Sequence, residues 1–344
     1  MRVFGWAADE SGCGAYRMLT PLRMLADHGH DTAWTVQRFG RSSVEFPPFL
    51  RTADIVVGQR LVLPRLVPVW RALREWGARL VYELDDDLFH VDVNSAAAHD
   101  LYVRPEVQQA LRAAVRAADL VTVSTEPLAA VVTAECDVDP ARVVVVPNLV
   151  DPAMFDVRPP ARPTKRPVVG WAGGPSHEAD IGDVAVHLRR FLDRNDAELH
   201  LVGADYRGLI RRDRVRYTRW APRVADYWAR VDFDVAICPL RHSTFNMSKS
   251  GCKALEMMAL GIPVVASDEM PYRDVIVDGV TGFLVRSGHE WVARLHDLVG
   301  DADLRTRMGA AARAHVAEHW SMRSGWQQWE NAYRRLLDVA AVAA

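Results

Sequence analysis

The chain has 344 residues, which is too many for one ordinary hydrophobic core and fits two domains of about 150 residues each. Its net charge is −2 at pH 7 with 25% charged residues, so no overall attraction to nucleic acid or to an anionic membrane is expected. It has no apolar run of about 18 residues and no basic segment followed by an apolar one at the N-terminus, so neither a membrane span nor a secretory signal is predicted.

The four cysteines are scattered through the sequence without CxxC spacing, which argues against a zinc site or a disulfide framework. They are Cys13, Cys136, Cys238 and Cys252, and none belongs to a CxxC motif. Isolated cysteines are typical of a reducing compartment, so we expect a cytoplasmic protein.

Strand and helix patterns alternate through the first half of the chain. Short apolar strands are predicted at residues 3–6, 31–36, 54–58, 80–83, 120–124 and 143–146. Helical patterns run through residues 16–27, 66–76, 107–118 and 127–135. This alternation predicts an α/β domain at residues 1–156, built on a doubly wound parallel sheet with right-handed crossovers.

A turn of small residues follows the first strand. Ser11, Gly12 and Gly14 allow the backbone to approach a ligand at the carboxyl end of that strand. The spacing is not GxGxxG and no acidic residue ends the second strand, which argues against a dinucleotide cofactor. The turn is therefore a candidate acceptor or phosphate loop, with a purely structural tight turn as the alternative.

Three carboxylates, Asp85, Asp86 and Asp87, follow the fourth strand. Such a cluster suits a hard metal ion, or it can orient or deprotonate a substrate hydroxyl. Helix capping and turn formation would use two of the three without any catalytic role. A glycoside hydrolase, which needs paired carboxylates, is a further interpretation.

The second half repeats the α/β pattern after a proline-rich, basic segment, residues 157–167, which we interpret as a linker. Strands are predicted at residues 168–171, 198–202, 215–218, 232–239 and 264–266, with a last strand in DGVTGFLV. Helical patterns at residues 183–194, 290–300 and 302–319 complete a second domain at residues 168–320. Aromatic and leucine residues at helical spacing in the tail, residues 321–344, predict a helix that packs back on the first domain.

Two turns of the second half carry ligand-binding residue types. Gly173 and Gly174 follow its first strand and let the backbone approach a phosphate, and His177 stands at the start of the next helix. His177 can donate a hydrogen bond to a ligand, or it can be an ordinary helix-start residue beside acidic neighbours. Trp220 follows the third strand and is either a contact for a nucleobase or a core tryptophan.

Residues 245–267, FNMSKSGCKALEMMALGIPVVAS, predict a loop, a short helix and a buried strand. Ser248 and Ser250 are N-cap residue types, and Gly261 fits the position just after a helix. In one continuous helix, Lys249, Lys253 and Glu256 would share a face. The opposite face, which carries Leu255, Met258 and Ala259, would then point to a core.

Lysine is rare in this chain, since only three of the 42 basic residues are lysines. Two of the three are Lys249 and Lys253, beside the predicted helix N-terminus, an arrangement that suits a diphosphate. The Glu256 carboxylate could accept hydrogen bonds from ribose hydroxyls. The alternative is a solvated helix face with a Lys253–Glu256 ion pair.

This segment, together with DEMPYRDVIVDGVTGFLV after it, resembles the donor-binding segment of family 4-type GT-B glycosyltransferases. That family has a Glu at the helix end, a Gly-x-Pro-Val-Val-Ala-Ser strand and a later DG-x-x-G-x-L-V. Glu256 corresponds to the second Glu of its Glu-x7-Glu motif, which holds the donor ribose. Ser248 stands in place of the first Glu, which grips the donor sugar.

The variant FN-x-x-KS-x-x-K-x-LE resembles a bacterial and phage subgroup of these enzymes, in which Lys249 and Lys253 would lie at the pyrophosphate. YELDDDLF, PNLVD and GWAGGPSHEAD are similar to the matching stretches of that group. The resemblance implies a GT-B fold, in which two Rossmann-like domains, each a doubly wound parallel sheet, face each other across a cleft.

The function implied by the resemblance is transfer of a hexose or pentose from a nucleotide-diphosphate sugar to an acceptor hydroxyl or amine. UDP or GDP is the expected nucleotide, retention at the anomeric carbon is expected, and no cofactor or metal is required. A small molecule or a glycan is favoured as acceptor over a nucleic acid.

The residues expected to carry the reaction divide into two groups. The catalytic group is Asp86, Asp87, Lys249 and Lys253. The donor-binding group is Gly173, Gly174, His177, Trp220, Asn246, Ser248, Lys249, Ser250, Lys253 and Glu256. Two alternatives stay open, which are a nucleotide-sugar-binding protein without turnover, because Ser248 replaces a glutamate, and a glycoside hydrolase that uses Asp85, Asp86 and Asp87.

Overall fold

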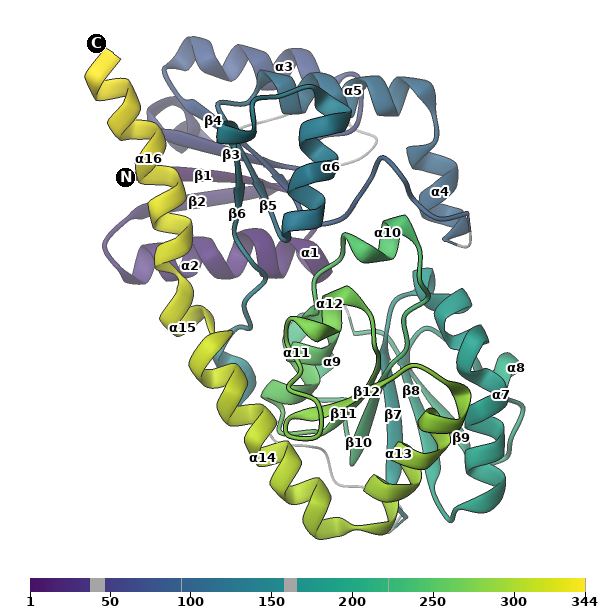
Figure 1. The fold of residues 1–344 in the computed structure, drawn as a ribbon. Coiled ribbons are helices and arrows are strands. Elements are labelled where there is room, and N and C mark those ends of the chain that lie inside the picture. Colours follow the sequence, from purple (N-terminus) through teal and green to yellow (C-terminus); the bar gives the residue numbers. More distant parts are fainter. Residues whose placement is uncertain (38–46, 94, 158–165, 222, 344) are drawn as a thin grey trace.

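The computed structural model describes residues 1–37, 47–93, 95–157, 166–221 and 223–343. The chain forms two α/β domains, one above the other in Figure 1, and each is built on a six-stranded parallel sheet. The two doubly wound sheets predicted from the alternating pattern are thereby confirmed. Most of the predicted linker, residues 158–165, lies outside the described residues.

The first sheet has the order β2-β1-β3-β4-β5-β6. Its strands are β1 (Arg2–Ala7), β2 (Asp31–Val36), β3 (Ile55–Gln59), β4 (Arg79–Leu84), β5 (Leu120–Val123) and β6 (Val143–Val145). The helices of this half are α1 (Gly12–Gly14), α2 (Thr20–Asp27), α3 (Leu66–Ala72), α4 (Ala96–Tyr102), α5 (Pro105–Ala117) and α6 (Glu126–Cys136).

The second sheet has the order β12-β11-β10-β7-β8-β9. Its strands are β7 (Val168–Gly173), β8 (Glu198–Gly203), β9 (Val215–Arg219), β10 (Val235–Cys238), β11 (Val264–Ser267) and β12 (Gly282–Val285). The helices of this half are α7 (Glu178–Arg194), α8 (Arg207–Ile210), α9 (Val224–Trp228), α10 (Thr244–Met247), α11 (Cys252–Ala259), α12 (Met270–Arg273), α13 (Gly288–Gly300) and α14 (Ala302–His319).

Each sheet has one point where the strand order reverses. In the first sheet β1 lies between β2 and β3, and in the second β7 lies between β8 and β10. Ligands of open α/β sheets bind beyond the carboxyl ends of the strands at such a point. The sequence builds these sheets from short apolar runs, because strands covered by helices on both faces need no polar alternation. All six residues of β7 are buried.

The helix after β1 begins earlier than the apolar periodicity predicts. It starts at Gly12 rather than near residue 16, and a π-helical segment, Ala15–Leu19, joins α1 to α2. Gly14 is required here, because a Cβ at this position would lie 1.8 Å from the carbonyl oxygen of Asp9. The glycine turn is thus the first turn of the helix itself.

The prediction of one continuous helix through Lys249, Lys253 and Glu256 is wrong. Residues 244–247 form the separate helix α10, which is capped by the Ser243 side chain, and α11 begins only at Cys252. Lys249 therefore lies in the loop between the two helices. The N-cap of α11 is Gly251, without a side-chain cap, so neither Ser248 nor Ser250 has the predicted capping role.

The chain crosses between the domains twice, and the two crossings lie together. Val150 follows the first domain, and its N–H donates to the carbonyl oxygen of Trp320 at 2.8 Å. The Met322 N–H donates back to the Val150 carbonyl oxygen at 2.9 Å. From there α15 (Met322–Gly325) and α16 (Gln327–Ala343) run along the first domain (Figure 1). Trp329 and Tyr333 of α16 are buried in a core shared with β1 and β3.

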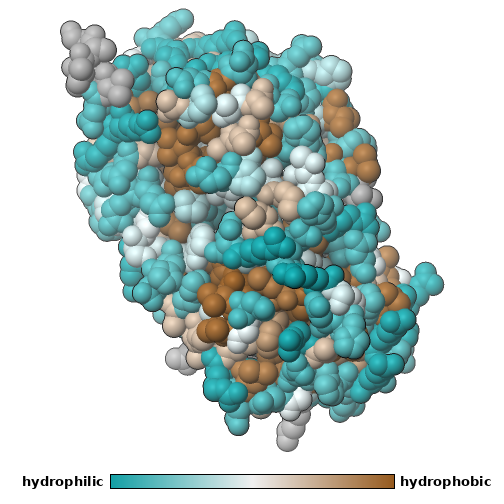
Figure 2. Space-filling view, in the orientation of Figure 1, coloured by the Kyte–Doolittle hydropathy of each residue, from teal (hydrophilic) through white to brown (hydrophobic). Residues whose placement is uncertain are grey.

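Hydrophilic side chains cover most of the face shown in Figure 2, with apolar patches on both domains. Within the part of the chain that the structure describes, no helix combines the length and the apolar character needed to cross a bilayer.

Candidate functional site

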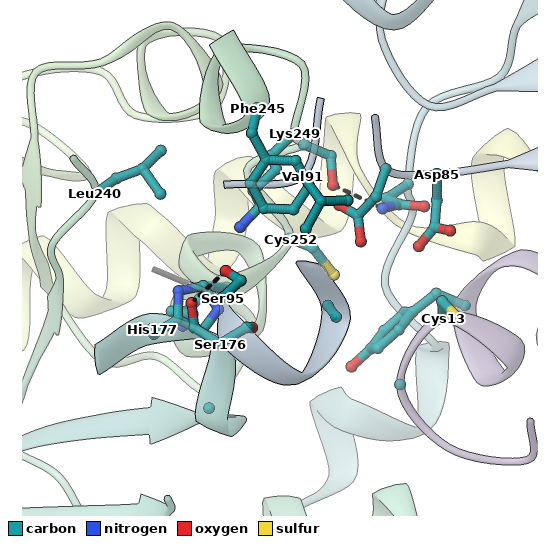
Figure 3. Close-up of a pocket in the computed structure, with 18 of the residues that line it drawn as sticks. Cys13, Asp85, Val91, Ser95, Ser176, His177, Leu240, Phe245, Lys249 and Cys252 are labelled. Carbon is teal, nitrogen blue, oxygen red and sulfur yellow. Dashed lines mark hydrogen bonds between the residues drawn. The ribbon is translucent and has the colours of Figure 1, made fainter. Parts of the chain in front are cut away.

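A cavity of about 350 Å³ lies between the domains. It is lined by residues that follow β1, β3 and β4 of the first domain and by residues at the ends of β7 and β10 of the second. Both strand-order reversals therefore open onto the same cavity. In Figure 3, Cys13 and Asp85 lie on one side, His177 and Ser176 on another, and Phe245 and Lys249 between them.

The structure brings most of the predicted site residues together and leaves the others out. Those that line the cavity are Gly12, Asp86, Gly173, His177, Trp220, Lys249, Ser250, Lys253 and Glu256. Those that do not line it are Ser11, Gly14, Asp87, Gly174, Asn246 and Ser248.

Lys253 is the most unusual charged group of the cavity. Its Nζ is buried and has no hydrogen-bond partner among the described residues, and it lies 4.7 Å from the centre of the Trp171 ring. Burial, with a contribution from the positive charge of Lys249, lowers the pKa of Lys253 to about 8. The alternative of a solvated helix face with a Lys253–Glu256 ion pair is therefore wrong.

Gly173 makes room for this ammonium group. A Cβ at Gly173 would lie 2.7 Å from Lys253 Nζ and 2.8 Å from the Trp171 ring. The glycine at the end of β7 is thus needed for the approach of the lysine, in addition to any approach of a ligand. Gly174 has open space at the same position and shows no such requirement.

Lys249 contributes the second positive charge. Its Nζ lies 4.4 Å from the centre of the Phe245 ring. Lys249 also acts on Asp86 of the first domain, since its charge helps to lower the pKa of that carboxyl. The ammonium group therefore faces the cavity with a carboxylate of the other domain nearby.

His177 is held in place by a carboxylate of its own helix. Its Nδ1 lies 2.7 Å from Asp180 Oδ2. Burial and the charge of Lys253 lower the pKa of His177 to about 4, so the ring is neutral at pH 7. With Nδ1–H donating to Asp180, Nε2 is left as an acceptor, which suits a sugar hydroxyl better than a phosphate oxygen.

Glu256 is buried, and besides Trp228 and Tyr227 of its own domain a residue of the first domain is its hydrogen-bond partner. The Tyr16 hydroxyl donates to Glu256 Oε1, and Trp228 Nε1 donates to the Tyr16 oxygen at 3.4 Å. Burial raises the pKa of Glu256 to about 7, although the Tyr16 hydrogen bond and the charge of Lys253 oppose the rise. The carboxyl thus titrates near neutral pH.

Arg60 holds two of the three consecutive carboxylates. Its Nε donates to Asp85 Oδ1 at 2.8 Å, and its Nη2 donates to Asp86 Oδ2 at 2.7 Å. Burial raises the pKa of Asp85. Burial also acts to raise the pKa of Asp86, but Arg60 and Lys249 outweigh it and lower that pKa. Two neighbouring carboxyls therefore differ in proton affinity within one ion-pair cluster.

Asp87 is turned away from the cavity. It is fully buried, and its carboxylate accepts hydrogen bonds from the backbone N–H groups of Phe89 and His90 and from His90 Nδ1. This is the turn-forming role that the sequence left open as an alternative for part of the cluster.

The polar residues of the α10–α11 segment mostly form hydrogen bonds within the second domain or between the two domains. Asn246 Nδ2 donates to the Arg241 carbonyl at 2.8 Å, within the second domain. Thr125 Oγ1 of the first domain donates to the Ser248 carbonyl at 2.8 Å, and Asn148 Nδ2 donates to Ser250 Oγ at 2.6 Å. Ser248, the position of the family's first Glu, is buried at the domain contact rather than at the cavity surface.

The far edge of the cavity has another contact between the domains. Ser95, just before α4, donates from its Oγ to the Ser176 carbonyl at 3.2 Å. Figure 3 shows Ser95, Ser176 and His177 grouped together. The structure is thus closed around the cavity on this side as well.

Trp220 packs against the core of the second domain and also has a face on the cavity. Its ring stacks on Tyr227 with the centroids 4.5 Å apart and the planes 27° apart. It is only partly buried, and it lines the cavity. An aromatic surface of this kind can receive a nucleobase by stacking.

Several cavity residues were missed from the sequence, and Tyr16 and Arg60 are the most important. Arg60 directly follows β3 at the strand-order reversal and has a positive φ of 48°. Its place at the carboxyl end of a strand is a signal that could have been used. Tyr16 lies inside a helical segment with no motif, and no local signal marks it.

Among the described residues, no group of three or more His, Cys, Asp or Glu side chains is arranged to hold a metal ion.

Comparison with known proteins gives agreement in sequence and in fold. Residues 166–301 match the family model for glycosyl transferases group 1. The D-inositol 3-phosphate glycosyltransferase of Nocardia farcinica is 46% identical over 70 residues, which are 20% of this chain and 15% of that protein. The 2-deoxystreptamine N-acetyl-D-glucosaminyltransferase of Streptomyces fradiae is 29% identical over 260 residues, 64% of this chain and 59% of that protein.

The similarity in structure extends over nearly the whole chain. The crystal structure of Anabaena HepE in complex with UDP and glucose has a TM-score of 0.67 at 16% identity, and the match covers 97% of this chain and 100% of that chain. The two six-stranded sheets agree with this match. The protein therefore has the GT-B fold, and residues 166–301 of its second domain are similar to group 1 glycosyl transferases.

Proposed function

We propose that this protein is a glycosyltransferase that moves a sugar from a nucleotide-diphosphate donor to an acceptor hydroxyl or amine. The donor binds to the second domain, and the acceptor enters from the first. The observation that carries the proposal is the buried Lys253 ammonium group, which has no hydrogen-bond partner among the described residues. An unpaired buried cation is destabilising, and a bound diphosphate supplies the missing negative charge.

The lysine pair and α11 would act on the leaving group. As the glycosidic bond breaks, negative charge builds on the diphosphate oxygen that departs. Lys249, Lys253 and the N-terminal N–H groups of α11 are positioned to stabilise that charge more than the charge of the intact donor. This difference between transition state and ground state is what accelerates the transfer.

The remaining cavity residues suit the other parts of the donor. Trp220 would stack on the base, and Glu256 would accept hydrogen bonds from the ribose hydroxyls. His177 Nε2 would accept a hydrogen bond from a sugar hydroxyl. We take UDP as the first nucleotide to test, because the similar HepE structure contains UDP.

The acceptor side is formed by Asp86 with Arg60. The Asp86 carboxylate is about one-third exposed and lines the cavity, so it can accept a hydrogen bond from the attacking hydroxyl or amine. Asp87 has no such access and is not part of the proposed chemistry. Retention at the anomeric carbon stays our prediction from the family resemblance, and the anomeric coupling constant of the product by NMR tests it.

The hydrolase alternative finds little support in the geometry. A glycoside hydrolase needs an acid and a second carboxylate on opposite sides of the bond, roughly 5 to 10 Å apart. Here Asp85 and Asp86 are bound to the same guanidinium group, and Asp87 faces the protein interior. We therefore do not propose hydrolysis as the function.

A thermal-shift panel of UDP-, GDP-, dTDP- and ADP-sugars tests donor binding, since a ligand that binds only the native state raises its melting temperature. We expect stabilisation by at least one donor and loss of that shift in the double variant Lys249→Ala/Lys253→Ala. The matched control is Arg207→Ala, which removes an exposed cation of the same domain. A shift that survives in the double variant would place the diphosphate elsewhere.

Nucleotide release separates transfer from binding without turnover. The first acceptors to test are D-inositol 3-phosphate and 2-deoxystreptamine, after the names of two similar proteins. Release that depends on an acceptor supports transfer, and equal release without acceptor indicates hydrolysis. Donor binding with no release for any acceptor would favour the binding-protein alternative.

A further inference from the structure

Tyr16 connects the two domains inside the cavity. It belongs to the π-helical segment after β1, and its hydroxyl donates to the Glu256 carboxylate on α11. Both residues are buried, with 7% of Tyr16 and 8% of Glu256 exposed, and both line the cavity. Trp228 Nε1 donates to the Tyr16 oxygen and so fixes its position.

This hydrogen bond uses the acceptor that the proposed function gives to the donor ribose. A phenol O–H and a ribose O–H are the same kind of donor to a carboxylate. We propose that Tyr16 is a positioning residue that takes the place of the ribose, so that its hydroxyl holds Glu256 until a ribose hydroxyl of the nucleotide replaces it. This inference rests on the proposed function, because it names the residue with which the donor competes.

The surroundings of Glu256 explain why the ligand-free protein needs such a substitute. A buried carboxyl group without a hydrogen-bond partner carries the full cost of its lost hydration. Burial already raises the pKa of Glu256 to about 7, which shows how poorly the site tolerates the charge. Trp228 and Tyr227 supply part of this hydrogen bonding from the same domain, and the Tyr16 hydroxyl is the partner from the facing domain, which a ligand can replace.

The exchange would also couple the nucleotide to the domain contact. Tyr16 comes from the first domain and Glu256 from the second, so breaking their hydrogen bond removes one contact between the domains. The ribose would restore a partner for Glu256 without restoring that contact. Donor binding would thus weaken the attachment of the helical segment that carries Gly12 and Cys13, which line the acceptor side of the cavity, to a single hydrogen bond between Trp228 and Tyr16.

Isothermal titration of the Tyr16→Phe variant with UDP tests the proposal. Removal of the competing hydroxyl should strengthen UDP binding about 10- to 150-fold, the range expected for one hydrogen bond to a carboxylate. 2′,3′-Dideoxy-UDP and pyrophosphate lack the ribose hydroxyls and should show no gain. The control is Tyr82→Phe, which removes a buried hydroxyl of the same domain that donates to the Leu61 carbonyl.

Three results would overturn the proposal. Weaker UDP binding by Tyr16→Phe would show that Tyr16 supports the bound nucleotide, and unchanged binding would show no competition. An equal gain for 2′,3′-dideoxy-UDP would show that loosening of the domains, rather than release of Glu256, is the cause. Tyr16→Met, of similar bulk and without a hydroxyl, serves as a second variant if Tyr16→Phe does not fold. If wild-type protein binds no UDP or GDP, the proposed function itself fails, whereas normal wild-type binding with an unaffected variant refutes only the role of Tyr16.

Discussion

Lys253 Nζ lies 4.7 Å from the centre of the Trp171 ring and has no hydrogen-bond partner among the described residues. A cation–π contact contributes about 0.5 to 2 kcal/mol, which is less than the several kcal/mol that desolvation of an ammonium group costs. Lys253 therefore lowers the stability of the ligand-free protein. Ligand-binding residues often destabilise the ligand-free protein in this way, because the ligand supplies the counter-charge that the protein lacks.

Replacement of Lys253 by Met should stabilise the protein and weaken its ligand binding at the same time. We expect the free energy of unfolding to rise by about 1 to 3 kcal/mol, because an uncompensated buried charge is removed. UDP binding should weaken by about 30-fold or more, since a desolvated ion pair with the diphosphate is lost. Urea denaturation and isothermal titration measure the two effects.

The control is Lys249→Met, which removes the other ammonium group. Lys249 is part of the same cavity but is not among the buried groups without a partner, so its loss should weaken UDP binding with little gain in stability. A destabilised Lys253→Met variant with normal UDP affinity would contradict the role that we give to Lys253.

UDP binding should take up protons at pH 8. Lys253, with a pKa of about 8, is half protonated there, and a bound diphosphate raises that pKa by charge attraction. The uptake should approach about half a proton per UDP at pH 8 and fall at pH 7, where the lysine is already mostly charged. Titrations in two buffers of different ionisation enthalpy, such as Tris and HEPES, measure it. A binding enthalpy that is the same in both buffers, or an uptake that persists in Lys253→Met, would rule out this origin.

Glu256 should make the stability of the protein depend on pH. Its pKa is raised from 4.5 to about 7, so the native state binds this proton more tightly than the unfolded chain does. The contribution is fully present below pH 4.5 and is lost as the pH rises through 7, by up to about 3 kcal/mol. Glu256→Gln, which resembles the protonated carboxyl, should lack this loss.

The measurement is the difference in unfolding free energy between wild type and Glu256→Gln at pH 5, 6, 7 and 8. This difference should change in favour of the variant from pH 5 to pH 7 and level off towards pH 8. Glu178→Gln, at an exposed glutamate of α7, is the control and should leave the pH profile unchanged. A constant difference across the range would show that Glu256 does not titrate there.

Loss of Arg60 should destabilise the first domain through its carboxylate partners. Arg60→Met leaves Asp85 and Asp86 without their counter-charge, and we expect a loss of about 2 to 4 kcal/mol at pH 8. The loss should be smaller at pH 4, where protonation relieves the repulsion between the two carboxyl groups. Adding Asp85→Asn and Asp86→Asn to Arg60→Met should recover most of the stability.

The comparison is Arg207→Met, which breaks an ion pair of similar length whose side chains are 52% and 39% exposed. It should leave the stability almost unchanged, because water screens an exposed ion pair. If Arg60→Met behaves like Arg207→Met, the cluster is not the tightly coupled group that its burial indicates.

The sequence predicted the sheets well and the interruptions of helices poorly. Strands such as residues 168–171 are short apolar runs. That local pattern alone is enough to predict a parallel strand covered on both faces. The helix through Lys249 was placed by periodicity alone. The Ser243 cap of α10 and the Gly251 start of α11 divide that segment, and only the fold shows that both are used.

The sequence motifs identified most of the candidate site residues in the second domain and few of those in the first. Lys253 and Glu256 belong to one short segment, so a local motif could identify them. Tyr16 meets Glu256 across 240 residues of sequence, and no local pattern encodes such a contact. The three consecutive aspartates could not be told apart, because the backbone turn decides that Asp87 points inward while Asp85 and Asp86 face Arg60.

The paired chain crossings at Val150 and Met322 determine where the molecule can bend. Because two backbone hydrogen bonds join the crossings, the domains can pivot about this seam but cannot easily slide past each other. The Ser95–Ser176 contact lies on the opposite edge in Figure 1, near α4 and α7, so a small rotation moves it the farthest. A rotation of the domains about the Val150–Met322 seam would therefore separate the cavity walls most at the Ser95–Ser176 edge.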